Sequence, residues 1–410
     1  MYKVMDLFCG TGGFSKGFED AGPFEVVHGI DILPVATKTF KANHPLAYTV
    51  CGDIRKVRRS QISTETGLSV GDVDVIIGGP PCQGFSSIRP FRSSKDDDPR
   101  NTLFEEFASY INYFRPKVLV FENVVGLATY KKGDVLSQIL ETFESLGYDC
   151  DWKILNAANY GVPQKRERLI LLGVQSGGRI YFPRITHFYR GNTIGYRDPL
   201  RMAVLNQSGP STRASNEKTG LKQAVTVRQA IDDLPAISAG ETATRYTEAP
   251  HNEYQKMRRN NVPDDKLTLH SATKHGKRMM EIIRHSGKNI SYIPKELISS
   301  GFSTSYSRLS GDEPSTTLTV NFVHPASNKC IHPDLDRALT PREGARLQSF
   351  NDDFVFVGNR TQVVKQIGNA VPPLLGRAIA LRVLDALQDR VMEKEDGADT
   401  NKPQQLTLPI

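Results

Sequence analysis

A cysteine follows two prolines in a loop that comes directly after a predicted buried strand. Residues 78–86 read GGPPCQGFS and follow the strand expected at residues 73–77. The prolines restrict the backbone before Cys82, which suits a thiol held in one orientation at the edge of a sheet. For an arbitrary cysteine a buried packing role would be the better interpretation. The setting of Cys82 favours a nucleophile.

A glycine-rich loop follows the first predicted strand. Residues 6–14 read DLFCGTGGF and precede a stretch that can be helical. Gly10, Gly12 and Gly13 would let a ligand approach the backbone at the carboxyl edge of a sheet. No Gly-Lys-Ser/Thr follows, and the spacing departs from GxGxxG, which argues against phosphate and dinucleotide sites.

Two carboxylates accompany this loop. Asp31 ends the second predicted strand, 21 residues after Gly10, where it could accept hydrogen bonds from ribose hydroxyls. Asp53 stands before a helix-compatible stretch and could receive an adenine amino group. The loop and the carboxylates together predict a site for a nucleoside that carries no pyrophosphate.

Short apolar runs alternate with helical patterns up to about residue 183. Strands are expected at residues 4–8, 26–30, 73–77, 118–121 and 169–174, and helices at 33–43, 102–115 and 134–146. Continuous apolar runs suit strands buried on both faces. The pattern therefore predicts an α/β fold with a doubly wound, mostly parallel sheet.

The composition changes after residue 184 to Gly, Ser, Thr, Asn and scattered basic residues, which predicts an inserted, smaller, loop-rich domain. Thr340, Pro341 and Glu343 predict a capping box at the start of a helix, and a last helix is expected at 372–389. We expect a split catalytic domain at 1–183 and 355–392, a second domain at 184–354 and a polar tail at 393–410.

The net charge of +7 has one source in the chain. Residues 184–307 contain 19 Lys and Arg against 11 Asp and Glu, so the rest of the chain carries a charge of −1. The second domain is therefore the part expected to bind a polyanion.

The composition, 39% hydrophobic and 24% charged, is typical of globular proteins rather than disordered or fibrous ones. Five irregularly spaced cysteines make neither a disulfide framework nor a CxxC metal set, and His324, Cys330 and His332 lack a fourth zinc ligand. We expect no metal, no membrane span, no secretion signal and a cytoplasmic location.

Five motifs in order resemble the DNA (cytosine-5)-methyltransferase family, of the bacterial and phage restriction–modification type. They are DLFCGTGG at 6–13, PPCQ at 80–83, FENV at 121–124, QKRER at 164–168 and QIGNAVP at 366–372. The resemblance extends from residue 6 to about residue 380. It implies that Cys82 adds to C6 of cytosine, that Glu122 serves N3 as an acid, and that Arg168 contacts O2. Arg166 would help to place Glu122 or a phosphate.

The resemblance also implies the S-adenosylmethionine-dependent methyltransferase fold, which is Rossmann-like, and S-adenosyl-L-methionine as methyl donor. Phe8 and Ile32 would cover the adenine, Asp31 would hold the ribose, and Asp53 and Ile54 would address the adenine edge. The methionine end would be closed by Pro81, Leu103 and the segment from Asn369 to Val371.

Double-stranded DNA is the implied substrate, with the target base flipped out of the stack. A loop at 83–100, including Gln83, Ser86, Ser87 and Arg89, would close over the DNA. Exposed basic residues of the second domain would bind phosphates; those expected are Arg258, Arg259, Lys274, Lys277, Arg278, Arg284 and Lys288.

Alternatives remain open from the sequence. One branch of the family methylates tRNA, and a catalytically silent, sequence-specific DNA binder is a third possibility. The end of the chain, from Gln405 to Ile410, resembles a short peptide that binds the DNA sliding clamp, although a disordered end is the simpler interpretation. A cognate restriction endonuclease, without stable contact, is a further expected partner.

Overall fold

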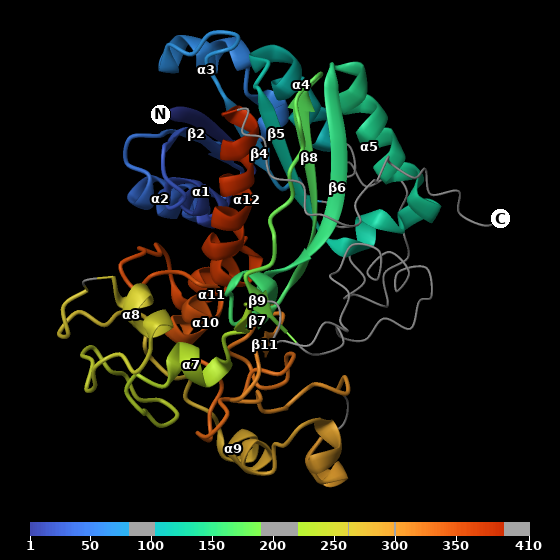
Figure 1. Cartoon of the computed structure of the whole chain (residues 1–410). Helices are drawn as coiled ribbons and strands as arrows, with labels where there is room; N and C mark the ends of the chain where they lie inside the picture. The colour runs from blue at the N-terminus through green and yellow to red at the C-terminus, as the bar shows by residue number, and fades with distance from the viewer. Residues whose placement is uncertain (82–102, 190–219, 261, 299–300, 389–410) are drawn as a thin grey trace.

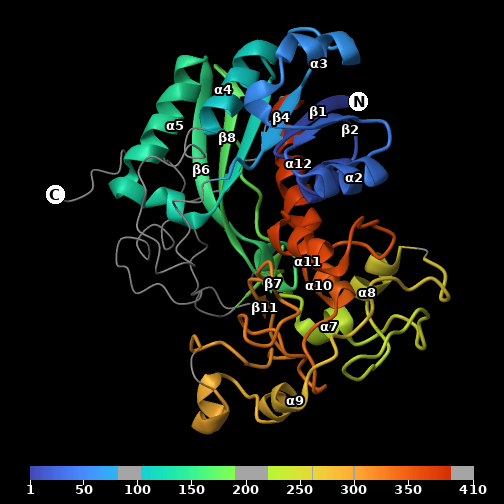
Figure 2. The same cartoon turned by 180° about the vertical axis from the view of Figure 1, so that it is seen from behind.

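The computed structural model of the protein describes residues 1–81, 103–189, 220–260, 262–298 and 301–388. A twisted sheet lies between helices in one part of the molecule, and short helices and loops gather below it around α7 to α11 (Figures 1 and 2). The second part is therefore rich in loops, as the composition after residue 184 predicted.

The main sheet has the strand order β3-β2-β1-β4-β5-β8-β6 among the described residues. Its strands are β1 (Tyr2–Leu7), β2 (Phe24–Asp31), β3 (Tyr48–Cys51), β4 (Val75–Gly78), β5 (Val118–Asn123), β6 (Tyr148–Asn156) and β8 (Glu167–Gln175). β8 runs antiparallel to both of its neighbours, and the pairs among β1 to β5 are parallel. The prediction of a mostly parallel α/β sheet is confirmed.

Alternate residues of each central strand supply two separate cores. Met5 and Ile76 face one core, and their neighbours Val4 and Ile77 face the other. The first core is covered by α3 (Arg59–Thr66), α4 (Leu103–Phe114) and α5 (Asp134–Ser145). The second is covered by α1 (Gly13–Glu19), α2 (Pro34–Asn43) and α12 (Pro373–Leu387). The sheet is therefore doubly wound.

The last helix packs against the first one. A Cβ on Gly17 of α1 would lie 2.5 Å from the carbonyl oxygen of Pro373, so only glycine allows this close approach. Leu375, Ile379 and Val383 of α12 are buried against the sheet. Helix α12 thus lies against the sheet and the helix that the first residues of the chain form.

A third core lies in the loop-rich part, with Val227, Leu318, Phe350 and Ile367 among its buried members. The helices that contribute to this core are α7 (Val227–Ile231), α8 (Glu253–Arg259), α10 (Pro341–Leu347) and α11 (Arg360–Asn369). The other named elements of the described residues are β7 (Gln164–Lys165), β9 (His187–Phe188), β10 (Lys222–Gln223), β11 (Ser315–Thr316) and α9 (Lys277–Arg284). The Thr340 side chain accepts a hydrogen bond from the backbone N–H of Glu343, and the Glu343 side chain accepts one from the backbone N–H of Thr340. This confirms the predicted capping box.

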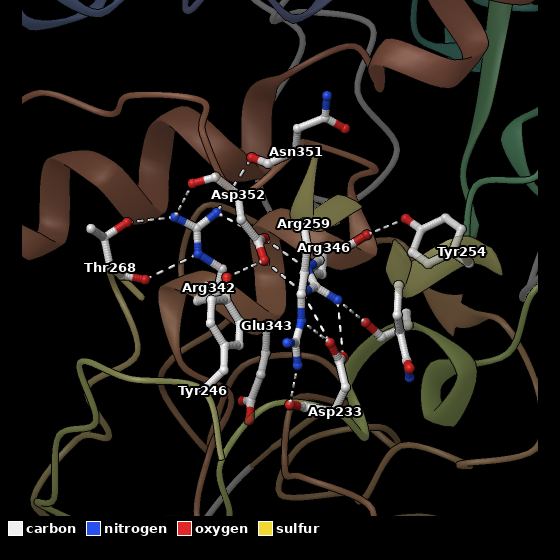
Figure 3. Close-up of polar contacts among 12 residues, drawn as sticks. Asp233, Tyr246, Tyr254, Arg259, Thr268, Arg342, Glu343, Arg346, Asn351 and Asp352 are labelled. Carbon is white, nitrogen blue, oxygen red and sulfur yellow. Dashed lines mark hydrogen bonds and ion pairs between the residues drawn. The ribbon is translucent and has the colours of Figure 1, made fainter. Parts of the chain in front are cut away.

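Buried arginines and carboxylates join the helices around this core (Figure 3). Arg346 of α10 lies 3.1 Å from an Asp233 oxygen and 2.5 Å from an Asp352 oxygen, and Arg342 lies 3.2 Å from Asp352. Arg259 of α8 lies 2.8 Å from the other Asp233 oxygen. Burial raises the pKa of Asp352, but Arg342 and Arg346 outweigh it and hold that pKa below its usual value.

Two residues expected to bind phosphates belong to the interior instead. Arg258 and Arg259 are each only 6% exposed, and Arg258 donates a hydrogen bond to the carbonyl oxygen of Ser349. The prediction for these two was wrong, because both side chains are buried: Arg259 binds Asp233, and Arg258 binds a backbone carbonyl inside the protein. The other residues of that set are exposed, namely Lys274, Lys277, Arg278, Arg284 and Lys288.

Candidate active site

The predicted site residues follow strands that end at the same edge of the sheet. Leu7, at the end of β1, pairs with Ile30 of β2 and with Gly78 at the end of β4. The antiparallel strand β8 begins at this edge, where Leu169 pairs with Asn123 at the end of β5. The loops after β1, β2, β4 and β5 and the start of β8 therefore meet at this edge.

The glycine-rich loop is tied to the end of β2. Its first glycine, Gly10, has a φ of 51° and donates its N–H to Asp31 Oδ2 at 3.0 Å. Asp31 Oδ1 accepts from the Leu33 N–H at 2.8 Å. Burial raises the pKa of Asp31, and these backbone hydrogen bonds oppose the shift. Asp31 therefore fixes the loop, and each of its oxygens retains lone pairs for a ligand.

The other two glycines of the loop allow contacts with distant segments. A Cβ on Gly12 would lie 2.5 Å from His44 Nε2, and one on Gly13 would lie 2.6 Å from the Val371 carbonyl oxygen. Asn369, which ends α11, is exposed. The structure thus brings Val371, the last residue of the expected segment from Asn369 to Val371, beside the loop. Sequence reasoning missed His44, whose buried ring supports the loop from α2.

An acid lies beneath the loop. Asp6 is 2% exposed and accepts a hydrogen bond from the Ser15 hydroxyl at 2.6 Å. Burial raises the pKa of Asp6 to about 8, although the Ser15 hydrogen bond opposes the shift. Asp6 joins the end of β1 to α1, so its contact is structural.

Several groups at this edge suit a nucleoside ligand. Ile32 is 61% exposed, and a Cβ added to Gly10 would find no atom within 4 Å. The Thr11 hydroxyl is buried and has no hydrogen-bond partner among the described residues. An exposed apolar side chain, open space at the loop and an unsatisfied hydroxyl fit an adenine ring with a polar attachment. Phe8, with a φ of 62°, begins the loop and packs against the first core.

The surroundings of Asp53 and Ile54 differ in detail from the expectation that both address the adenine edge. Asp53 caps the short 3-10 helix Ile54–Lys56 and pairs with Arg55 at 2.7 Å. The side chain of Ile54 is 5% exposed within the first core, so only its backbone can face a ligand. Arg55 hydrogen bonding lowers the pKa of Asp53.

Glu122 and Arg168 form an ion pair at the same edge. Arg168 Nε lies 2.8 Å from Glu122 Oε1, and both side chains are largely buried. A Cβ on Gly79 would lie 2.7 Å from Glu122 Oε2, so the carboxylate stands over the start of the Pro-Pro-Cys loop. Asn123 also holds that loop, because its side chain donates to the Pro80 carbonyl oxygen at 3.2 Å.

Some predicted residues lie outside the described residues, namely Cys82, Gln83, Ser86, Ser87 and Arg89. Pro81 is the last described residue before them, and Leu103, buried in the first core, begins α4 after them. Among the described residues before this segment, Gly79 lies beside Glu122.

Arg166 lies close to this pair without sharing its contact. It is 2% exposed, its Nη1 donates to the Leu318 carbonyl oxygen at 3.5 Å, and its Nε has no partner among the described residues. Burial, with a contribution from Arg168, holds the pKa of Arg166 well below its usual value. A carboxyl group beside Arg168 can give a proton to a basic ring nitrogen, while the guanidinium group stabilises developing negative charge.

The described part of the chain contains no cluster of three or more residues able to hold a metal ion. It also contains no helix long and apolar enough to cross a membrane. Cys330 donates to the His324 carbonyl oxygen at 3.0 Å, and His332 Nδ1 accepts from two backbone N–H groups.

Comparison with known proteins identifies the family of this chain. Residues 2–385 match the family described as C-5 cytosine-specific DNA methylase. The chain belongs to this family. The sequence-based resemblance is therefore confirmed, and this C-5 cytosine DNA methylase is an enzyme whose methyl donor is S-adenosylmethionine.

Individual proteins similar to this DNA methylase are also named as DNA methyltransferases or type II methyltransferases. The type II methyltransferase M.AgeI of Thalassovita gelatinovora is 35% identical, over 92% of this chain and 98% of that protein. The type II methyltransferase M1.HphI of Haemophilus parahaemolyticus is 35% identical, over 93% and 86%. A putative DNA modification methyltransferase from an E. coli prophage aligns with a TM-score of 0.69 and 25% identity, over 95% of this chain and 100% of that one.

Proposed function

We propose that this DNA methylase methylates C5 of a flipped-out cytosine in a specific duplex sequence, through a covalent bond between Cys82 and C6. The observation that carries the proposal is the Glu122–Arg168 pair over Gly79, three residues before Cys82. A thiolate added to C6 makes C5 an enamine carbon, and protonation of N3 by Glu122 balances the charge. Arg168 would hold O2.

The electrophilic methyl group comes from S-adenosylmethionine. After transfer, the C5 proton leaves to a base, the C6–S bond breaks, and Cys82 is restored as a thiolate. Buried Arg166 keeps Glu122 and Arg168 in place rather than reaching a phosphate, since it is only 2% exposed.

The cofactor residues would act as the geometry suggests. Exposed Ile32 would cover one adenine face and Phe8 the other, while Asp31 would accept from the ribose hydroxyls. Asp53 and the Ile54 backbone would address the adenine edge. The methionine end would be closed by Pro81, Leu103 and the segment from Asn369 to Val371, and the loop of Gly10, Gly12 and Gly13 would line the cofactor.

The domain division remains part of the proposal. Residues 1–183 and 355–392 would form the catalytic domain, and residues 184–354 the domain that selects the DNA sequence. Five exposed basic residues of the second domain support a phosphate-binding role, namely Lys274, Lys277, Arg278, Arg284 and Lys288. Gln83, Ser86, Ser87 and Arg89 would contact the DNA around the flipped base.

The biological setting is proposed from the type II relatives. The enzyme would protect host DNA in the cytoplasm, at the nucleoid, against a cognate restriction endonuclease with which it makes no stable contact. The end of the chain, Gln405 to Ile410, lies outside the described residues, and its docking on a sliding clamp stays a sequence-based hypothesis.

A fluorinated duplex tests the mechanism. Fluorine at C5 of the target cytosine cannot leave as a proton does, so the Cys82–C6 bond is expected to persist after methyl transfer. A denaturing gel should show a DNA–protein adduct with the wild type, provided that the duplex contains the target, and none with Cys82→Ala. The target can first be located by bisulfite sequencing of DNA from a host expressing the enzyme. An active wild type that forms no adduct would exclude the covalent route, and methyl transfer to tRNA instead of DNA would support the RNA alternative.

Replacing Asp31 by Asn tests the cofactor site. The Asn side chain keeps the shape of Asp31 but carries no charge. Its NH₂ group would face one of the two backbone N–H groups that now donate to Asp31. The Kd for S-adenosylmethionine, measured by calorimetry, is expected to rise about 10- to 100-fold, as for lost hydrogen bonds to a charged group. Asp20→Asn, which removes a surface carboxylate paired with Lys16, is the control. Equal affinities in the two variants would contradict the role of Asp31.

A further inference from the structure

The segment that carries Arg166 and Arg168 begins with a fully buried glutamine. Gln164 lies in β7, two residues before Arg166 and four before Arg168, and is 0% exposed. Its Oε1 accepts from the Leu318 N–H at 3.1 Å. Its Nε2 donates to Gln348 Oε1 at 3.1 Å and to the Leu347 carbonyl oxygen at 3.2 Å.

The second amide of this contact is also fixed in orientation. Gln348, likewise 0% exposed, donates its Nε2 to the Ile367 carbonyl oxygen at 2.7 Å. A backbone carbonyl can only accept and a backbone N–H can only donate, so the two ends of the chain of hydrogen bonds dictate how both amides point. Rotating either amide would set acceptor against acceptor or donor against donor inside the protein.

This chain of amides joins three parts of the site. At one end, the Leu318 carbonyl accepts from Arg166, and the neighbouring Thr317 hydroxyl donates to the Lys165 carbonyl at 2.7 Å. At the other end, Ile367 lies in α11, two residues before Asn369, which leads to the glycine-rich loop. Between them, Gln348 directly follows α10, the helix that holds Arg342 and Arg346.

We infer that Gln164 and Gln348 are positioning residues, which together set the placement of Arg166 and Arg168 relative to Glu122. Gln348 acts from the loop-rich part of the molecule, where it follows α10. The inference rests on the proposed roles of Glu122 and Arg168 at the target base. Neither glutamine touches the base or the cofactor in this scheme. Their effect passes through the backbone of residues 164–168.

Methionine substitutions remove the amides while keeping similar size. Gln164→Met and Gln348→Met are each expected to lower kcat about 10- to 100-fold, with the KM for S-adenosylmethionine within about twofold of wild type. The double variant should match the more severe single variant, because both remove one shared set of hydrogen bonds. Gln255→Met is the matched control, since Gln255 is equally buried but lies in α8, outside this chain.

A charged variant supplies a readout that loss of stability alone would not give. In Gln164→Glu, an ionised carboxylate would face the Leu347 and Gln348 oxygens, both acceptors, whereas a protonated carboxyl group restores one donor. The kcat of Gln164→Glu relative to wild type should therefore rise as the pH is lowered, with the ratio for Gln164→Met unchanged. Thermal unfolding of each variant confirms that folded enzyme is compared.

The expected results distinguish the positioning role of Gln164 and Gln348 from the catalytic role of the Glu122–Arg168 ion pair. Parallel pH profiles for Gln164→Glu and Gln164→Met, or kcat values for the methionine variants equal to that of Gln255→Met, would overturn the positioning role. Arg168→Ala is measured in the same assay. If it keeps wild-type kcat, the proposed function of the ion pair fails; if it is impaired while the glutamine variants are not, only the inference about Gln164 and Gln348 fails.

Discussion

Replacing Glu122 by Gln is expected to lower kcat for methyl transfer roughly 10²- to 10⁴-fold, the usual contribution of a general acid. The amide oxygen of Gln can still accept from Arg168 Nε, which lies 2.8 Å from Glu122 Oε1 in the native enzyme. The variant therefore keeps the local shape but cannot transfer a proton to N3. The negative charge that grows on the ring when the thiolate adds would stay uncompensated.

Single-turnover transfer of a labelled methyl group measures this effect without product release. The Kd for S-adenosylmethionine should remain within about twofold, because Glu122 is not among the residues assigned to the cofactor. Glu144→Gln, an exposed residue of α5, controls for the loss of one negative charge. A Glu122→Gln rate within about twofold of the control would remove Glu122 from the catalytic residues.

The fold was predictable where strands are buried on both faces. β1, β2, β4, β5 and β8 are apolar runs in the sequence, and the structure confirms all five. The edge strands β3 and β6 were missed. In β6, Asp149 and Asp151 interrupt the apolar pattern, since an edge strand leaves part of its surface to solvent. The reversed direction of β8 has no signal in the sequence, because an apolar run looks the same in either direction.

Part of the site was predictable: Asp31 was expected from its place at the end of a strand, and Glu122 and Arg168 from the family resemblance. Asp31, Glu122 and Arg168 lie at the common sheet edge, and the last of these reaches Glu122 because β8 starts there. The contact between Gln164 and Gln348 spans 184 residues and joins two uncharged side chains, so no local pattern announces it. Arg258 and Arg259 looked like a surface run, because the sequence does not show that Asp233 lies beside them.

Removing the buried Arg346 side chain is expected to destabilise the protein strongly. Arg346→Met should lower the free energy of unfolding by about 3–5 kcal/mol, as when one partner of a buried ion pair is removed. Arg346 is fully buried, contacts both Asp233 and Asp352, and donates to the Ala230 carbonyl oxygen at 3.0 Å (Figure 3). Without it, two buried carboxylates share the remaining guanidinium groups of Arg259 and Arg342.

Urea unfolding followed by tryptophan fluorescence and circular dichroism measures the change. Arg228→Met is the matched control, because Arg228 also binds a carboxylate through two nitrogens, those of Asp334, but its side chain is 40% exposed. An exposed pair of this kind contributes about 1 kcal/mol or less. Equal losses for the two variants would contradict a special role for the buried network.

The pH dependence of the Arg346→Met effect identifies its electrostatic part. The folded-state pKa of Asp352 lies below its ordinary value, because Arg342 and Arg346 outweigh the effect of burial. Its carboxylate therefore contributes stability that is fully present above about pH 4 and is lost as the pH falls through the folded-state pKa. Arg346→Met weakens this contribution, so the wild type and the variant should approach one another in stability below about pH 4. A difference that stays constant from pH 7 to pH 3 would assign the loss to packing rather than to charge.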